Sequence, residues 1–467
     1  MERPCEACYG GRLMKPRTKP RPHPRHPPKP SGGAPAAVDV DRLAWGGKGV
    51  GRLGGKVVFV SKAVPGDKVL VRMEKEKPRY AEGRIEAVLR PSPHRVDPKC
   101  KFFSHCGGCQ WLAVAYERQL EEKESLVRSA LRRHVAACPP EAIVPAPSPR
   151  GYRHRIQLHV KPSGRGVKIG FYQEESHQVI NLDLCLLVDD AFNAVYGKLR
   201  SALQEEPAAR CLEGLTLARS ESEPEYVLFM ALAEAAGEAE VERVFQALDP
   251  LGLAGALAAP SRDEGKVLRR SGRPWVRYAV DGPSGQPFEL RADVRSFTQA
   301  SYAMNRALVR SAVDWLAPYR TERILDLYAG VGNFTLPMAS ACREVVAVEA
   351  SPTAHQDAKE NTERNGLENI RHLPGQAGEW TTKLAAASER FDAVLLDPPR
   401  TGAREVLEPL ALLAPKRILY VSCNLPALDR DVEDLGRLGY LPERIQPWDL
   451  FPQTYGVETL VLLTKKG

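Results

Sequence analysis

The chain has 467 residues, which at roughly 100–200 residues per domain predicts two to four domains. Hydrophobic residues make up 43% of it and charged residues 27%, as in ordinary globular proteins. No run approaches the ~18 consecutive apolar residues of a membrane-spanning helix. The N-terminus lacks the apolar core of a secretory signal, so we expect a cytoplasmic protein without membrane contact.

The net charge of +8 is unevenly distributed along the chain. Residues 1–37 hold 8 Lys/Arg against 2 Asp/Glu, and residues 38–100 hold 14 against 8, so the remainder is mildly acidic at −4. This asymmetry favours a polyanion-binding module attached to a catalytic body. Ten cysteines are too few for a disulfide scaffold, and their clustering in a cytoplasmic chain indicates a metal, a cluster or catalysis.

The first segment, residues 1–37, contains nine prolines and is predicted to be a disordered basic tail. Its Cys5 and Cys8 form a single CxxC pair, which is half of a metal site. Residues 38–92 then change to short strand-like runs between Gly-rich turns, which predicts a small β-barrel of the oligonucleotide-binding type. The Lys/Arg on its outer faces suit contact with a phosphate backbone.

Three cysteines follow on a Gly-rich loop, at Cys100, Cys106 and Cys109. A closed site needs a fourth ligand, for which Cys185 is the candidate, and an iron–sulfur cluster or Zn²⁺ would suit thiolate ligands. Residues 110–134 have apolar positions at helical spacing and predict one long helix that packs on the catalytic domain. The rest of residues 93–290 mixes strand-like and helical runs, which predicts an α+β middle domain.

Residues 291–467 alternate apolar strand candidates with helical segments, which predicts a doubly wound, mostly parallel α/β sheet. The first strand runs into Asp326 and a turn with Gly330 and Gly332, and Glu349 ends the next strand. Glycines bring the backbone close to a ligand, and an acid after the second strand suits ribose hydroxyls. Because no third glycine follows at dinucleotide spacing, S-adenosylmethionine fits this turn better than NAD does. An NAD-dependent oxidoreductase is the alternative that the missing glycine disfavours.

Three further residues follow or precede strands of this sheet: Asp397 in a rigid Asp-Pro-Pro-Arg turn, Cys423, and Glu458 just before the last strand. A thiol, a carboxylate and a methyl donor at one rim suggest methylation at C5 of a pyrimidine. The thiolate adds at C6, C5 takes the methyl group, and a base removes the C5 proton. A buried core cysteine and a surface carboxylate are the alternatives for Cys423 and Glu458.

At this point the chain resembles the uracil-5 RNA methyltransferase family, in its branch with an N-terminal TRAM domain and an iron–sulfur cluster. The resemblance covers residues 38–467 and rests on CKFFSHCGGCQW, YRHRIQL, GFYQEESHQVINLDLC, FTQAS, DLYAGVGNF, VAVEAS, LLDPPR, YVSCN and TYGVETLVLL, in family order. Two positions depart from the family pattern: Ser301 stands where Asn is usual, and Gly456 where His is frequent.

The resemblance implies a role for each motif. It makes Cys423 the nucleophile that adds to C6 of the base and Glu458 the proton acceptor. It makes Gln299, Tyr328, Glu349 and Asp397 the contacts of S-adenosyl-L-methionine. It makes Cys100, Cys106, Cys109 and Cys185 the ligands of a [4Fe-4S] cluster, in preference to zinc, and Arg153 and Arg155 contacts of RNA.

The resemblance further implies an enzyme that forms 5-methyluridine in RNA, with 23S rRNA preferred over tRNA as the substrate. A non-catalytic RNA-binding protein on the same scaffold is the alternative from another class. The expected domains are the tail (1–37), a TRAM β-barrel (38–92), an iron–sulfur and middle α+β domain (93–290) and a class I methyltransferase domain (291–467). No obligate protein partner is evident in the sequence.

Overall fold

The computed structural model describes residues 34–263 and 265–466, so most of the predicted tail, with Cys5 and Cys8, lies outside the described residues. The described chain begins with a closed five-stranded barrel in the order β1-β2-β3-β5-β4. Its strands are β1 (Ala36–Leu43), β2 (Gly49–Leu53), β3 (Lys56–Ser61), β4 (Lys68–Glu76) and β5 (Tyr80–Arg90). Alternate valines such as Val38, Val58 and Val69 fill the interior. The predicted small barrel is confirmed.

The middle of the chain forms a six-stranded sheet in the order β11-β10-β9-β8-β6-β7. Its strands are β6 (Arg155–Ser163), β7 (Gly166–Gly170), β8 (Leu212–Arg219), β9 (Tyr226–Leu232), β10 (Gly255–Pro260) and β11 (Arg269–Gly272). The helices α2 (Asp190–Gln204) and α3 (Glu238–Leu248) share one apolar core with it. Asp189 caps α2 by accepting a hydrogen bond from the Phe192 amide.

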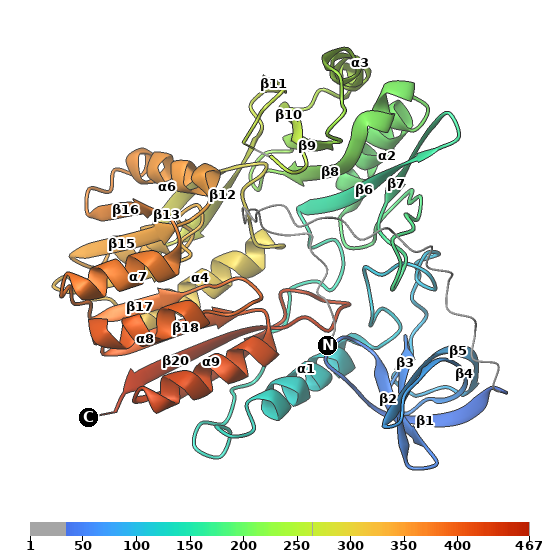
Figure 1. The fold of residues 1–467 in the computed structure, drawn as a ribbon, viewed down its shortest axis with the longest axis horizontal. Helices are drawn as coiled ribbons and strands as arrows, with labels where there is room; N and C mark the ends of the chain where they lie inside the picture. The colour runs from blue at the N-terminus through green and yellow to red at the C-terminus, as the bar shows by residue number, and fades with distance from the viewer. Residues whose placement is uncertain (1–33, 264, 467) are drawn as a thin grey trace, which may run out of the picture.

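The C-terminal body is a seven-stranded sheet in the order β16-β15-β14-β17-β18-β20-β19 (Figure 1). Its strands are β14 (Arg323–Leu327), β15 (Glu344–Glu349), β16 (Ile370–Pro374), β17 (Ala393–Leu396), β18 (Arg417–Ser422), β19 (Tyr440–Trp448) and β20 (Glu458–Lys465). The strands β14 to β18 are parallel, whereas β20 runs antiparallel to both of its neighbours. The doubly wound α/β architecture is therefore confirmed.

Helices cover both faces of this sheet. One face packs against α7 (Ala377–Ala386), α8 (Arg404–Leu413) and α9 (Leu425–Arg437), and the other against α4 (Tyr302–Leu316), α5 (Thr335–Ala339) and α6 (Pro352–Arg364). Helix starts follow local capping rules: Ser351 accepts from the Ala354 amide, and a proline occupies the first turn of α6. None of the helices in the described ranges is long and apolar enough to cross a membrane.

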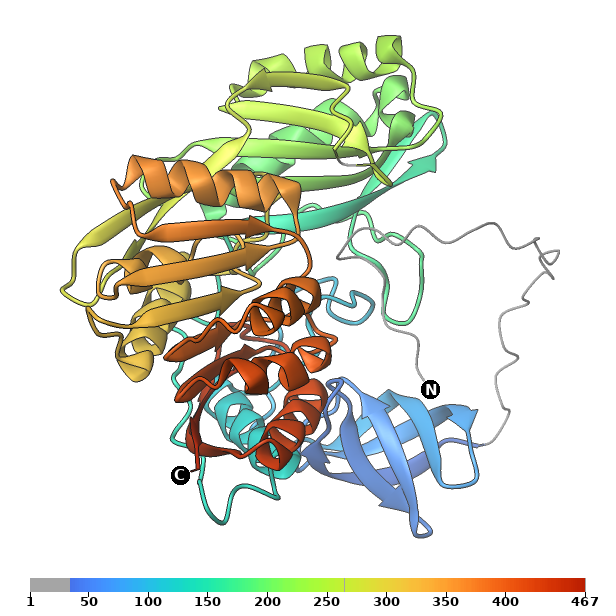
Figure 2. The ribbon, with the colours of Figure 1, turned by 60° about the vertical axis from the view of Figure 1, so that its left-hand side comes forward.

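Helix α1 (Tyr116–Ala130) lies against the C-terminal sheet, beside α9, and next to the barrel (Figures 1 and 2). Its Val127 is fully buried in the core that α7, α8 and α9 share with the sheet. The helix is shorter than the predicted range 110–134. Trp111 to Val114 form a turn instead, because the Trp111 amide bonds to the Gln453 carbonyl rather than to a helical partner.

A hairpin of β12 (Trp275–Asp281) and β13 (Pro287–Asp293) connects the middle sheet to the C-terminal body. Hydrogen bonds tie β13 to α6: the Asn361 side chain bonds to the backbone of Arg291, and Asp357 accepts from the Asp293 amide. The domain boundary predicted at 290/291 therefore falls inside a strand, and the hairpin packs as part of the C-terminal body.

Candidate active site

The carboxyl edge of the C-terminal sheet gathers three acidic side chains. In register, Asp326 on β14 stands beside Leu395 on β17, which puts Asp397 just past that edge, and Glu349 ends β15 on the other side. A turn with Gly330 (φ +58°) and Gly332 (φ +95°) follows β14, in a backbone region that L side chains rarely adopt. The edge of an open α/β sheet is where such folds bind ligands.

The three acids form an acidic cradle, in which hydrogen bonds hold two of the carboxylates. Glu349 accepts hydrogen bonds from the amides of Gly330 (2.8 Å) and Ser351 (2.6 Å). Asp326 accepts one from the Thr335 hydroxyl at 2.5 Å, while its second carboxylate oxygen is buried without a partner. Burial, with the charge of Glu349 adding to it, raises the pKa of Asp397 to about 7. A cationic ligand would lower the raised pKa of Asp397 again. The acidic cradle therefore fits the positively charged sulfonium and amine of S-adenosylmethionine.

Cys423 and Glu458 meet at the same edge although 35 positions separate them in the sequence. Cys423 directly follows β18, whose Ser422 pairs with Thr459 of β20. Because β20 is antiparallel, its first residue, Glu458, lies where the neighbouring parallel strand ends. Glu458 is 2% exposed and Cys423 is half-buried.

The electrostatics of this pair involve a cation that sequence reasoning left without a role. Burial, and then the charge of Glu458, raise the pKa of the Cys423 thiol to about 12, while the Arg400 guanidinium opposes the shift. Burial also raises the pKa of Glu458 well above its usual range, and Arg400 again opposes this. Arg400 belongs to the Asp-Pro-Pro-Arg turn, and the rigidity of that turn was the signal that could have identified it.

The remaining predicted contacts of S-adenosylmethionine lie on two loops. Gln299 is buried in the segment that precedes α4. His154, just before β6 of the middle sheet, contacts this segment: its ring lies 3.3 Å from the Thr298 hydroxyl, and its backbone amide donates to the Ala300 carbonyl. Tyr328 adopts a left-handed backbone (φ +66°), and its hydroxyl donates to Glu405 of α8 at 2.6 Å. The hydroxyl of Tyr328 is thus engaged with a helix, and its side chain packs against the core that α7, α8 and α9 share with the sheet.

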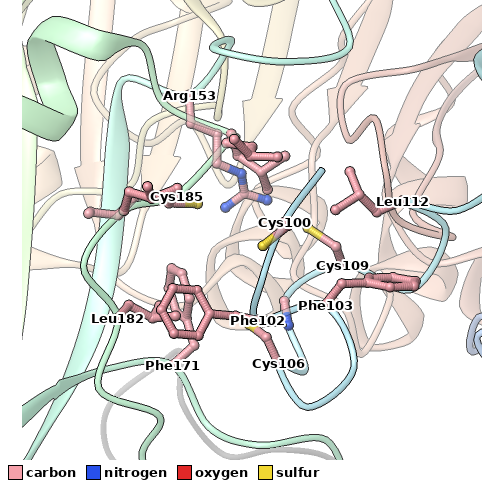
Figure 3. Close-up of a pocket in the computed structure, with 15 residues that line it drawn as sticks. Cys100, Phe102, Phe103, Cys106, Cys109, Leu112, Arg153, Phe171, Leu182 and Cys185 are labelled. Atoms are coloured by element: carbon pink, nitrogen blue, oxygen red, sulfur yellow. Dashed lines mark hydrogen bonds between the residues drawn. The ribbon is translucent and has the colours of Figure 1, made fainter. Parts of the chain in front are cut away.

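The four predicted metal-binding cysteines line one cavity of about 90 Å³ (Figure 3). Cys100, Cys106 and Cys109 come from the Gly-rich loop and Cys185 from the segment before α2, and all four are free thiols. Apolar side chains that include Phe102, Phe171 and Leu182 form the rest of the wall. A Cβ at Gly107 would stand 3.2 Å from the Tyr172 carbonyl oxygen, so this loop packs tightly on the segment that follows β7.

Arg153 lies in this cavity, with its guanidinium directed between the cysteines (Figure 3). Arg155 starts β6, and its guanidinium donates to the Ser296 carbonyl at 2.6 Å. The predicted RNA contact is wrong for Arg153, because its side chain faces the cysteines. That prediction rested on the family resemblance, and Arg153 precedes β6 rather than lying in it.

A seven-stranded sheet with a Gly-rich turn after one strand and an acid after the next defines a methyltransferase domain, here joined to a small barrel. The family described as tRNA (Uracil-5-)-methyltransferase matches residues 279–466, and the TRAM domain matches residues 35–85. An uncharacterized RNA methyltransferase of Thermosynechococcus vestitus is 37% identical over 92% of this chain and 98% of its own length. The 23S rRNA (uracil(1939)-C(5))-methyltransferase of Marinomonas sp. is 33% identical over 97% of this chain and 100% of its own.

The chain therefore belongs to the family of RNA uracil-C5-methyltransferases, enzymes that use S-adenosylmethionine, as the sequence motifs predicted. Among solved structures, the tRNA (uracil-54, C5)-methyltransferase of Pyrococcus abyssi, in complex with S-adenosyl-L-homocysteine, has a TM-score of 0.70. It is 24% identical and covers 91% of this chain and 100% of its own. This similarity supports the same fold over the 91% of the chain that is covered.

Proposed function

We propose that the chain methylates C5 of a uridine through a covalent adduct on Cys423. The Cys423 thiolate adds to C6 of the base, which makes C5 nucleophilic, and C5 takes the methyl group of the donor. The Glu458 carboxylate then accepts the C5 proton, and the bond between C6 and sulfur breaks to release the thiolate. The observation that carries this proposal is the convergence of Cys423, Glu458 and Arg400 at the edge that holds the acidic cradle.

Each residue of the site has a part in this proposal. Arg400 stabilises the thiolate, since its positive charge opposes the burial that favours the neutral thiol. Glu349, Asp397, Gln299 and Tyr328 are the proposed contacts of S-adenosylmethionine, which supplies an electrophilic methyl group when bound.

We propose 23S rRNA as the RNA substrate, because relatives with that printed activity align with nearly the whole chain. This substrate agrees with a cytoplasmic location. Mapping of 5-methyluridine in ribosomal and transfer RNA from a strain that lacks the gene tests the choice. Loss of one 5-methyluridine from 23S rRNA, restored by the gene, supports it, whereas loss from tRNA alone assigns the enzyme to tRNA.

We propose that Cys100, Cys106, Cys109 and Cys185 hold a [4Fe-4S] cluster, because all four side chains line one cavity. A zinc ion would require the sulfurs to converge at about 2.3 Å from a single atom. Four thiolates in one largely apolar cavity are the ligand set of an iron–sulfur cluster, and Arg153 offers a cation beside their negative charge.

The cluster proposal predicts that anaerobically purified protein is brown and contains about four iron atoms per chain. Cys109→Ser is expected to remove most of the iron and the visible absorption, because a closed cluster needs all four thiolates. Cys342→Ser is the matched control, since Cys342 is buried in another core. A colourless protein with one zinc per chain contradicts the proposal.

The barrel supports a specific RNA contact at one end. Most of its cations pair with carboxylates, for example Lys68 and Arg90 with Asp39 and Arg84 with Glu74. In the described chain, Arg52, Lys77 and Arg79 form no ion pair and are exposed. They lie on two neighbouring turns, which the Lys56–Glu76 ion pair joins at 2.7 Å. Tyr80 directly follows Arg79, and its ring packs edge-on against Phe59. Free cations beside aromatic rings suit a nucleic-acid backbone and its bases.

Replacement of Arg52, Lys77 and Arg79 together by glutamine is expected to weaken RNA binding in low salt and to flatten its salt dependence. Each lost phosphate contact lowers the slope of log K against log salt by about 0.7–0.9. The matched control replaces Lys68, Arg84 and Arg90 by glutamine. It removes the same number of positive charges, but from side chains that already pair with carboxylates. Equal slopes in both triple variants would show that this end of the barrel makes no specific contact.

A further inference from the structure

The loop of residues 449–457 joins β19 to β20 and ends at Glu458. Segments from the N-terminal third of the chain contact this loop, whose Leu450 and Val457 also pack in the cores of the C-terminal body. Figures 1 and 2 show α1 beside the red C-terminal elements, with the barrel next to it. Their contacts with the loop lie within nine residues of Glu458, where β20 begins.

Helix α1 holds the start and the middle of the loop through buried polar groups. The Lys123 ammonium donates to Asp449 at 2.5 Å and to the Phe451 carbonyl at 3.0 Å, and both charged side chains are 0% exposed. Gln119 donates to the Gln453 side chain at 3.0 Å and accepts from its amide at 2.9 Å. Buried pairs of this kind are costly to separate, because a buried charged or polar group that loses a partner is left without water to replace it.

The loop adopts a strained backbone at the point where these contacts meet. Gln453 has φ +70°, a conformation that non-glycine residues rarely adopt. Its carbonyl accepts a hydrogen bond from the Trp111 amide at 3.0 Å. The surrounding contacts therefore impose this conformation on the loop five residues before Glu458.

The barrel contacts the same loop through its β1–β2 turn. The Trp45 ring packs edge-on against Tyr455 at 5.1 Å, three residues before Glu458. The Trp111 indole donates to the Gly47 carbonyl at 3.1 Å, so Trp111 bonds to the barrel turn and to the loop. A Cβ at Gly47 would stand 3.1 Å from the Tyr455 ring, so the turn sits directly on the loop.

We propose that the barrel turn and α1 position the Glu458 carboxylate, with Trp45 and Gln119 as positioning residues. The barrel that binds RNA thereby sets the efficiency of the proton removal that ends the reaction. This inference rests on the proposed function and assigns the N-terminal domain a part in catalysis beyond holding the substrate. It predicts that a loosened turn slows the release of the adduct and leaves its formation unchanged.

The test uses Trp45→Ala in the full chain, with Trp45→Phe to restore a ring and Leu89→Ala as a control. Leu89 is a barrel residue that is 53% exposed. Excess enzyme reacts once with labelled RNA and saturating S-adenosylmethionine, and a denaturing gel follows the covalent adduct over time. We expect Trp45→Ala to slow the decay of the adduct roughly tenfold or more, with RNA affinity within about twofold of wild type, and Trp45→Phe to recover most of the rate.

Tyr455→Leu approaches the same contact from the loop, and the inference expects the same slow decay if Trp45→Ala impairs folding. Weaker RNA binding with an unchanged adduct decay in these variants would overturn the inference, because the barrel would then be a simple tether. If no variant forms an adduct, including Glu458→Gln, the proposed covalent chemistry itself fails and this inference fails with it. The two failures are therefore distinguishable.

Discussion

Cys423→Ala is expected to abolish methylation, with a loss of at least about 10⁴-fold in single-turnover rate. Without the sulfur, C6 has no nucleophile to add to it, and C5 of uracil is too poor a nucleophile to take the methyl group. The variant should form no covalent complex with RNA. Methyl transfer from labelled S-adenosylmethionine and denaturing gels measure the two effects.

The fold of this variant should be intact, because the half-buried Cys423 lies at the edge of the sheet and outside its apolar cores. A thermal unfolding midpoint close to wild type, together with unchanged donor binding, is the control. Cys342→Ala provides a matched replacement of a cysteine elsewhere and should remain active. Substantial activity in Cys423→Ala would refute the assignment of the nucleophile.

Glu458→Gln is expected to reduce turnover by about 10²–10⁴-fold and to accumulate a methylated protein–RNA adduct. The glutamine keeps the shape of the side chain but does not accept the C5 proton, so elimination of the Cys423 sulfur stalls. Addition and methyl transfer precede this step and should proceed. A denaturing gel measures this adduct as a band that has the combined mass of protein and RNA and carries the label of the transferred methyl group.

The neighbouring carboxylate is the control for this second prediction. Asp397→Asn is expected to weaken donor binding instead, and it should not accumulate a methylated adduct, because that residue is a proposed donor contact. A Glu458→Gln variant that turns over freely, or one that binds RNA without forming an adduct, would contradict the assigned proton acceptor.

The sequence predicted the edge of the sheet from which this chemistry is argued. Asp326, Glu349, Asp397 and Cys423 each follow or end a short apolar run, and the carboxyl ends of parallel strands meet at one edge. Glycines after β14 and an acid after β15 further indicated the class of ligand. Local patterns were sufficient here because each strand end is read independently of the others.

The sequence did not predict the contacts that orient the last part of the site. Glu458 reaches the edge only because β20 is antiparallel, and β19, which precedes it, was missed because Pro442 and Pro447 interrupt its pattern. The Lys123–Asp449 pair spans 326 positions, and no local periodicity encodes such a pair. Arg153 was assigned to RNA by the family resemblance alone, and no local pattern indicates that its side chain lies among the four cysteines.

Release of tritium from RNA labelled at C5 of uridine tests the central claim most directly. Purified enzyme, S-adenosylmethionine and unmodified 23S rRNA should release one tritium for each methyl group transferred, because the proton at C5 is replaced. Cys423→Ala should release none. Methyl transfer without release of tritium would place the methyl group on another atom and would contradict the account.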